Sequence, residues 1–472
     1  MMSCLIKQNH YLIYWIPSNM SDIVQKLWNF CNILKDDGMH YGDYIEQLTY
    51  LLFLKMADEK GVKIPEKYNW DSLLNFSGTK LVDHYSELLR ELGKEEKVLG
   101  DIFKQSNNKF KNPVHLSKLI LLIDGEQWTA LDIDVKGSAY EGLLQKFAAE
   151  QKGAGQYFTP RELIRAIVQC IEPKHTETIH DPACGTGGFL IGAFEYIMRQ
   201  YEKGLLNLKR EQWDFLQKKA ISGGEIVWET RRLCIMNLYL HEIEAQIYYG
   251  DSLKERIGSY DVIVTNPPFG VKSGGQTYTR DDFTVQTSNK QLNFLQHCMS
   301  ILKSMGRCAM VMPDNVLFED GAGQKIRKIL LNGYNLHTIV RLPNGTFTPY
   351  AAGVKANVVF FEKTGKPTKE VWVYDLRTNI EKINKGHELT ADYFVDFLKC
   401  YRDRTKDTER WHKYSYKDIE DRKYNLDITW LKDENIEDPR NLPAPEILIK
   451  ESIKYLTDAI TQLKELENEI TK

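Results

Sequence analysis

The chain has 472 residues, of which 42% are hydrophobic and 27% are charged, and its formal net charge is −3. This length is sufficient for two or three domains, and the apolar fraction is sufficient for packed cores. A chain so close to neutral does not coat nucleic acid by bulk charge alone, although local basic patches or a partner can supply the contacts to nucleic acid.

The cysteines and histidines are not grouped as metal ligands or disulfide partners would be. None of the 8 cysteines forms a C-x-x-C pair, and the 11 histidines are dispersed along the chain. This distribution predicts reduced core thiols in a cytoplasmic protein that holds no metal. No apolar run reaches the length of a membrane span, and no small-residue cleavage site follows the short LIYWI stretch near the start. We therefore expect neither membrane attachment nor a signal peptide.

The N-terminal part of the chain has the periodicity of helices. We expect residues 1–19 to be a disordered tail and residues 20–145 to form a helical domain. Apolar side chains recur on one helical face from Tyr44 to Lys60, and further apolar clusters lie at 81–92 and 116–123. The sequence alone assigns no chemistry to this domain.

Residues 146–375 alternate between short β-branched runs and helical stretches, which is typical of an α/β domain. Most of these runs end at Gly, Pro, Asn or Asp. The pattern predicts a doubly wound, mainly parallel sheet. The predicted strands are 178–180, 220–222, 246–249, 262–265, 308–312, 338–341 and 358–361.

Residues 376–472 are expected to form a C-terminal linker and a helical region. The stretch DPRNLPAPE at 438–446 contains three prolines and is typical of a linker, and apolar residues return at helical spacing from Ile447 to Ile470. Such a helix either packs on its own domain or binds a partner. Its position behind a proline-rich linker favours the partner.

A strand, a glycine turn and a helix are predicted in TIHDPACGTGGFLIGAFEYIM, which begins at Thr178. Gly185, Gly187 and Gly188 permit positive φ angles and a close approach of ligand to backbone. A dinucleotide-binding turn would have another glycine at Leu190, and Asp181 would repel a pyrophosphate. That carboxylate suits a cation instead, such as the amino group or sulfonium of S-adenosylmethionine. A glycine turn alone is weak support, because many are plain strand–helix connections.

Two further acids follow predicted strands at the edge where open α/β sheets bind ligands. Glu225 follows the Ala220–Ile221 run, where a carboxylate can accept both ribose hydroxyls of a nucleoside. Asp251 follows IYYG and can accept a hydrogen bond from an adenine amine. Either residue alone is more often a helix cap or a turn residue. In series with the glycine turn, they favour a nucleoside site.

The most specific motif is NPPF at 266–269, which follows the buried strand YDVIVT. Two prolines fix φ and lack N–H donors, so the turn presents rigid acceptors. The Asn266 side-chain oxygen and the Pro267 carbonyl can take the two hydrogens of an adenine amine and direct its lone pair at a methyl sulfonium, while fixed dipoles stabilise the growing positive charge. Phe269 can stack on a base swung out of the duplex. A purely structural Asn-Pro turn is the alternative.

These motifs, in the order GQYFTP (155–160), DPACGTGGF (181–189) and NPPF, resemble the modification subunits of type I restriction-modification systems. The resemblance extends through LPNGTFTPYAAGVKANVVFFEK and RKYNLD, and so covers nearly the whole chain. It implies an S-adenosylmethionine-dependent methyltransferase fold and the transfer of a methyl group to the N6 amine of adenine in DNA. It implies catalytic roles for Asn266, Pro267 and Phe269. The cofactor-binding residues that it implies are Gln156, Tyr157, Phe158, Thr159, Pro160, Arg161, Thr186, Gly187, Gly188 and Glu225, with Asp181 and Asp251 close by.

The resemblance also implies partners. In this family a separate specificity subunit selects the DNA sequence, two modification subunits bind around it, and a restriction subunit completes the complex. The near-neutral charge and the lack of an obvious target-recognition insert after NPPF agree with this division of labour. The polar segment 273–291 is equally well explained as a mobile loop over DNA or as a plain surface loop. Phe347 is explained either as a contact to the flipped base or as a core aromatic.

Three other functions fit part of the sequence. Protein-glutamine methyltransferases share a similar turn, because an amide nitrogen presents the same geometric problem, but they are usually shorter and lack the upstream GQYFTP segment. Cytosine-N4 methyltransferases usually have Ser at the position of Asn266. An inactive scaffold with a methyltransferase fold would not need the intact set of Asp181, Glu225 and Asn266.

Overall fold

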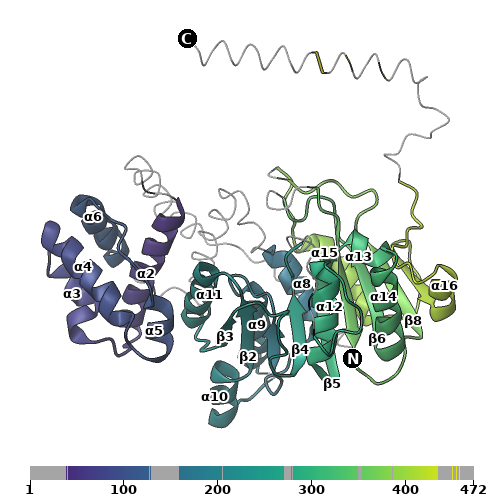
Figure 1. Ribbon diagram of the computed structural model, residues 1–472, viewed down its shortest axis with the longest axis horizontal. Coiled ribbons are helices and arrows are strands. Elements are labelled where there is room, and N and C mark those ends of the chain that lie inside the picture. The colour runs from purple at the N-terminus through teal and green to yellow at the C-terminus, as the bar shows by residue number, and fades with distance from the viewer. Residues whose placement is uncertain are drawn as a thin grey trace, which may run out of the picture. The chain divides into compact units, whose positions relative to one another are not determined.

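The computed structural model in Figure 1 describes residues 39, 41–126, 128, 159–204, 206–269, 278, 280–348, 353–384 and 386–433, together with 449, 453, 456 and 457. The predicted tail at 1–19 and most of the predicted helix at 447–470 lie outside this set. The chain divides into two compact units, one of Met1–Arg377 with Glu381–Thr429 and one of Thr378–Ile380 with Trp430–Lys472. In the second unit, the Asn379 amide donates to the Lys432 carbonyl at 3.0 Å.

The first unit begins with a group of helices, in agreement with the predicted helical N-terminal region. Asn69 and Asn112 cap α3 and α6, since each side chain accepts a hydrogen bond from a backbone N–H of the first turn. The three predicted helices are found within α2, α4 and α6. The elements are α2 (Tyr41–Glu59), the 3-10 turn η1 (Glu66–Tyr68), α3 (Trp70–Leu74), α4 (Thr79–Leu92), α5 (Lys97–Phe103) and α6 (Pro113–Asp124).

These helices pack against α11 (Trp228–Leu240), a helix of the α/β region. The rings of Phe53 in α2 and Tyr239 in α11 lie 5.1 Å apart between centroids. Two successive arginines of α11 add ion pairs. Arg231 Nη2 lies 3.2 Å from an Asp101 carboxylate oxygen, and Arg232 Nη1 lies 3.0 Å from Glu46. Aromatic packing and ion pairs therefore attach the helical region to α11.

Nine strands of the described residues form one sheet in the order β3-β2-β1-β4-β5-β7-β6-β8-β9. The pairs from β3 to β5 are parallel, and so is β6 with β8, whereas β7 is antiparallel to both neighbours and β9 is antiparallel to β8. This arrangement confirms the predicted doubly wound, mainly parallel sheet. The strands are β1 (Ile179–Asp181), β2 (Ile221–Glu225), β3 (Gln246–Tyr249), β4 (Tyr260–Thr265), β5 (Leu302–Pro313), β6 (Asn335–Arg341), β7 (Ala356–Glu362), β8 (Glu370–Asp375) and β9 (Trp411–Ser415).

The connecting helices cover the sheet in two groups. The strand order runs one way from β1 to β3 and the other way from β4 to β5, so right-handed crossovers place the helices that follow β1 and β4 on opposite faces. One group contains α8 (Arg161–Ile171), α9 (Gly188–Glu202) and α15 (Asp392–Arg402), and the other contains α12 (Lys290–Ile301), α13 (Asp314–Phe318) and α14 (Ala322–Gly333). The remaining helices are α10 (Arg210–Lys218) and α16 (Tyr416–Asp421). No helix of the described residues is both long and apolar enough to cross a membrane.

The sequence patterns did not reveal β8 and β9. Residues 371–375 of β8 are all buried, so this strand lacks the alternation of buried and exposed positions that marks a half-exposed strand. In β9 at the sheet edge, Trp411 is fully buried and its indole stacks on that of Trp372 with ring centroids 5.2 Å apart. The sheet thus continues beyond residue 375, and the domain limits drawn from the sequence stay a prediction.

We predict that Trp411→Ala lowers the free energy of unfolding by about 3–5 kcal/mol, because it leaves a cavity beneath Trp372 in a fully buried position. Urea denaturation followed by circular dichroism measures the change. Lys417→Ala, at an exposed position in α16, is the control and should change stability by less than about 0.5 kcal/mol. Equal small effects of both substitutions would show that β9 does not belong to the cooperative core.

Candidate active site

The glycine turn connects β1 to α9 at the carboxyl edge of the sheet. Gly185 and Gly187 have φ of +54° and +88°, and Gly187 is the residue before the first turn of α9. A Cβ on Gly187 would lie 3.0 Å from the Cys234 sulfur, and one on Gly188 would lie 2.9 Å from a methyl carbon of Ile164. Positive φ and close packing against α11 both require glycine at 187.

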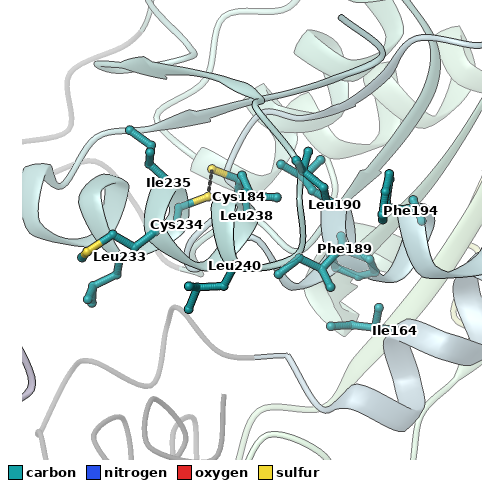
Figure 2. Close-up of a cluster of buried hydrophobic side chains, with 14 of the residues drawn as sticks. Ile164, Cys184, Phe189, Leu190, Phe194, Leu233, Cys234, Ile235, Leu238 and Leu240 are labelled. Atoms are coloured by element: carbon teal, nitrogen blue, oxygen red, sulfur yellow. Dashed lines mark hydrogen bonds between the residues drawn. The ribbon is translucent and has the colours of Figure 1, made fainter. Parts of the chain in front are cut away.

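Apolar side chains of three neighbouring helices pack against this turn. Figure 2 shows Phe189, Leu190 and Phe194 of α9, Leu233, Cys234 and Leu238 of α11, and Ile164 of α8. The Cys184 and Cys234 sulfurs lie 3.7 Å apart, and the Asn237 amide donates to the Thr186 carbonyl at 2.9 Å. The path of the turn is therefore set by α11 as well as by its own glycines.

Two carboxylates are buried at this edge. Asp181 ends β1 and accepts from the Ala183 N–H at 3.0 Å, and Glu225 ends β2 and accepts from the Gly185 and Val227 N–H groups at 3.1 and 2.8 Å. Burial raises the pKa of Asp181 to about 7, and the negative charge of Glu225 contributes to this increase. Burial also raises the pKa of Glu225 to about 7, although backbone N–H donors oppose the shift. Cationic or hydroxyl donors of a ligand would stabilise both charged forms.

Asp251 lies on the turn that follows β3. Its two carboxylate oxygens accept from the Leu253 N–H and from the Tyr278 hydroxyl, each at 3.0 Å. The next residue, Ser252, donates to the Pro182 carbonyl at 2.6 Å, which ties this turn to the glycine turn. Ile226, directly after Glu225, is 57% exposed and presents an apolar surface at the same edge.

A cavity that is open to solvent lies between the start of α8, the glycine turn and Asn266. Its charged lining combines both signs. Arg161 of α8 donates to Glu195 of α9 at 3.0 Å, and Arg199 lies 3.5 Å from the other oxygen of that carboxylate. The lining residues that the sequence predicted are Thr159, Arg161, Asp181, Thr186, Gly188 and Asn266, and Arg165, Glu195 and Ile164 are additional.

The NPPF turn emerges from β4 with its polar groups fixed. The Asn266 amide nitrogen donates to the Thr159 hydroxyl at 3.0 Å. The Asn266 side-chain oxygen is buried and has no hydrogen-bond partner among the described residues. Gln291 of α12 donates to the Pro268 carbonyl at 3.1 Å, and the Phe269 ring contacts Phe347 edge to face with centroids 6.0 Å apart. A buried acceptor without a partner is costly, so this oxygen is suited to a ligand donor.

The structure gathers most of the predicted site residues. Asp181, Glu225 and Asn266 follow three neighbouring strands, the glycines form the turn beside them, and Pro160 precedes α8 with Arg161 at its first position. Gln156, Tyr157 and Phe158 lie outside the described residues. The sequence did not indicate Glu195, Ile226, Tyr278 or Gln291. Glu195, Tyr278 and Gln291 contact segments far away in the chain, so no local sequence pattern marks them. Ile226 could have been found, because an exposed apolar residue directly after an acid at a strand end is a usable signal.

The residues present fit a nucleoside that carries a cationic amino-acid group. Thr186 and Gly188 of the glycine turn line the cavity, and two buried carboxylates lie beside it, where a cation and hydroxyl donors would stabilise their charged forms. Arginines 161 and 165 in the same cavity suit a carboxylate. Among the described residues, no group of three or more His, Cys, Asp or Glu side chains is placed to hold a metal ion.

Comparisons with known proteins identify the family of the chain. Residues 131–438 match the N-6 DNA methylase family and residues 23–62 match the HsdM N-terminal domain. The methylase subunits of the type I restriction enzymes StySPI from Salmonella potsdam and EcoKI from Escherichia coli K12 are 39% and 38% identical, each over 96% of both chains. A solved structure from work on the assembly of a type I R-M system superposes with a TM-score of 0.73 at 26% identity, over 96% of this chain and 98% of that one. The chain therefore belongs to the N-6 DNA methylases, as a methylase subunit of the type I restriction enzyme family.

Proposed function

We propose that this chain transfers a methyl group from S-adenosylmethionine to the N6 amine of an adenine flipped out of double-stranded DNA. The observation that carries the proposal is the buried side-chain oxygen of Asn266, which has no hydrogen-bond partner in the described part of the chain and lies beside the cavity that Asp181 and the glycine turn line. An amine with two hydrogens is the type of donor that this acceptor lacks. The named activity of the relatives, DNA methylation within type I restriction enzymes, supports the same reaction.

Asn266 directs the reacting nitrogen. Because its own amide nitrogen donates to Thr159, the side-chain oxygen is held in one orientation and acts only as an acceptor. With the Pro267 carbonyl as second acceptor, the turn accepts hydrogen bonds from both N–H groups of the amine. The nitrogen then becomes more tetrahedral, and its lone pair withdraws from conjugation with the ring and points at the methyl group. Positive charge grows on the amine during transfer and is stabilised by these fixed dipoles. No strong general base is needed before the transfer.

In the proposed cofactor site, different residues contact the amino-acid end and the nucleoside end of the ligand. When bound, S-adenosylmethionine supplies the electrophilic methyl group. Asp181 and Arg161, which line the cavity, would pair with a positive group and with the carboxylate of the ligand. Glu225 would accept from the ribose hydroxyls, and the exposed face of Ile226 would pack on the adenine. Thr159 contributes both to the cofactor cavity, which it lines, and to the catalytic turn, because its hydroxyl accepts a hydrogen bond from Asn266.

Phe269 and Phe347 form the base-binding wall. Their edge-to-face contact places the turn at 343–348 beside the catalytic turn. Phe347 itself is buried, so its main contact is Phe269, and the partly exposed Phe269 ring is the surface on which an extruded base stacks. Stacking compensates in part for the pairing and stacking that the base loses when it leaves the duplex.

We propose that the chain works with a specificity subunit and a restriction subunit, with two copies of this chain for each specificity subunit. The near-neutral net charge supports this assignment, because a protein that finds its DNA site alone usually carries a basic surface. The full-length similarity to methylase subunits of type I restriction enzymes supports it as well.

We predict that Asn266→Ala lowers kcat for DNA methylation by about 10²–10³-fold or more, because it removes a preorganised dipole at the reacting nitrogen. The assay co-expresses the chain with its specificity subunit, measures tritiated methyl transfer to unmethylated DNA and identifies the base by mass spectrometry. Affinity for S-adenosylhomocysteine should change little, because Asn266 holds the base. Asn332→Ala, on the surface of α14 where it accepts from Tyr416, should leave both measurements unchanged.

The same assay separates the alternatives. Methyl transfer to a protein glutamine, with none to DNA, would assign the chain to protein-glutamine methylation. Absence of transfer together with absence of cofactor binding would indicate an inactive scaffold. A parallel loss of cofactor affinity in Asn266→Ala would remove that residue from the role of holding the base.

We predict that affinity for S-adenosylhomocysteine rises with pH and levels off above about pH 7. The folded-state pKa of Asp181 is raised to about 7, so without ligand the carboxyl stays protonated below that pH, and a bound ammonium favours its charged form. Binding should therefore release protons near neutral pH. The same raised pKa stabilises the free protein at low pH, and this contribution is lost as pH rises through about 7. Isothermal titration calorimetry in buffers of different ionisation enthalpy measures the release, and Asp181→Asn should bind more weakly and remove Asp181's contribution to it.

We predict a complex of two of these chains with one specificity subunit. Native mass spectrometry of the co-purified assembly measures the ratio directly. A single copy in an assembly that methylates DNA would contradict the proposed stoichiometry without affecting the proposed chemistry.

A further inference from the structure

Tyr278 lies on the segment that runs from the NPPF turn to α12, yet its side chain reaches the turn after β3. The residue is 8% exposed, and its hydroxyl donates to Asp251 at 3.0 Å. Burial, together with the negative charge of Asp251, raises the pKa of Tyr278 to about 12, so the hydroxyl remains a donor at neutral pH. The segment after the catalytic turn is thus in direct contact with the acid assigned to the cofactor adenine.

Arg280 fixes this contact. Its side chain is 5% exposed, pairs with Asp282 and lies over the Phe283 ring. One terminal nitrogen donates to the Ser252 and Glu255 carbonyls at 3.3 and 3.4 Å and lies 2.8 Å from His297 Nδ1. Burial lowers the pKa of His297 to about 3, so the neutral ring accepts from the guanidinium. The hydrogen bonds of Arg280 therefore hold the segment 280–283 against the turn at 251–256.

Tyr278 and the backbone together determine how the Asp251 carboxylate is rotated. The Leu253 N–H occupies one oxygen and the Tyr278 hydroxyl occupies the other. Each oxygen keeps a further acceptor site, because a carboxylate can accept about four hydrogen bonds. The turn itself is tied to the glycine turn through Ser252 and Pro182. Without Tyr278, only one of the two donors that fix the carboxylate would remain.

We propose that Tyr278 is a positioning residue for binding of the cofactor adenine. Its hydroxyl holds the Asp251 carboxylate so that this carboxylate accepts a hydrogen bond from the exocyclic amine of the adenine. The proposal rests on the proposed function and adds a residue to the same site. It makes recognition of the cofactor amine depend on the chain segment that leaves the catalytic turn. A role limited to anchoring that segment would weaken all ligands alike, whereas a positioning role affects only ligands that carry the amine.

The test compares two ligands in a binding assay on the full chain. One is S-adenosylhomocysteine, and the other is its analogue with hydrogen in place of the 6-amino group. Tyr278→Phe should weaken S-adenosylhomocysteine by about 5–10-fold, the cost of disturbing one hydrogen bond to a charged group, and should change the affinity of the analogue less than about twofold. KM for S-adenosylmethionine should rise similarly while kcat at saturation is kept. Tyr334→Phe, which removes a hydroxyl hydrogen bond of 2.8 Å to Met299 outside the site, is the matched control and should affect neither ligand.

A second variant tests the route through Asp251. Asp251→Asn should discriminate between the two ligands as Tyr278→Phe does, and the double variant should lose no more affinity than Asp251→Asn alone, because both changes remove one interaction. Equal weakening of both ligands by Tyr278→Phe, or additive losses in the double variant, would overturn the positioning role while leaving the proposed function intact. Failure of the wild type to bind S-adenosylhomocysteine would overturn both.

Discussion

The pairing of β1 with β2 on one side and β4 on the other determines where the functional side chains meet. Register places Ile179 beside Ile221 and beside Val262, so the three strands run parallel and end at the same edge. The chain leaves each strand there through a turn, and the helices that follow β1 and β4 lie on opposite faces, which opens a crevice between the two turns. Asp181, Glu225 and Asn266 occupy these strand ends. No long-range loop is needed to assemble them, because sheet order alone does so.

Burial then gives these groups their chemical character. Asp181 and Glu225 would be ordinary carboxylates on a surface, but in the crevice their pKa values rise to about 7. The Gly185 N–H of the glycine turn and the Val227 N–H partly satisfy Glu225, and Thr159 satisfies only the nitrogen of Asn266. The site thus keeps acceptors whose partners must come from a ligand. Such groups reduce the stability of the free protein, and a ligand that supplies the donors recovers that stability.

The sequence predicted most of the strands, but it did not predict the side-chain contacts between segments that are far apart in the chain. Seven strands were predicted because β-branched runs ending in turn residues have a local signature, and the acids and NPPF at their ends followed from that order. β8 and β9 were missed: β8 is buried throughout and β9 contributes mainly Trp411 to the core. Glu195, Tyr278 and Gln291 were missed for another reason. Each acts through a partner more than ten residues away in the chain, at Arg161, Asp251 and Pro268 respectively, and only the folded structure brings those partners together.

Helix α11 joins the helical region to the catalytic edge, because it faces both. On one side Cys234 lies 3.7 Å from the Cys184 sulfur, and the Asn237 amide donates to the Thr186 carbonyl of the glycine turn. On the other, Arg231 and Arg232 pair with Asp101 and Glu46 of the N-terminal helices. Both arginines are almost fully buried, so replacing Asp101 or Glu46 by a neutral residue would leave a buried charge with less compensation, which costs more than breaking an exposed pair. Arg231 also donates to the Ile247 carbonyl on edge strand β3, next to the turn that carries Asp251. The helices to which sequence alone assigned no chemistry are therefore connected, through one helix, to the glycine turn and to the edge strand that precedes Asp251.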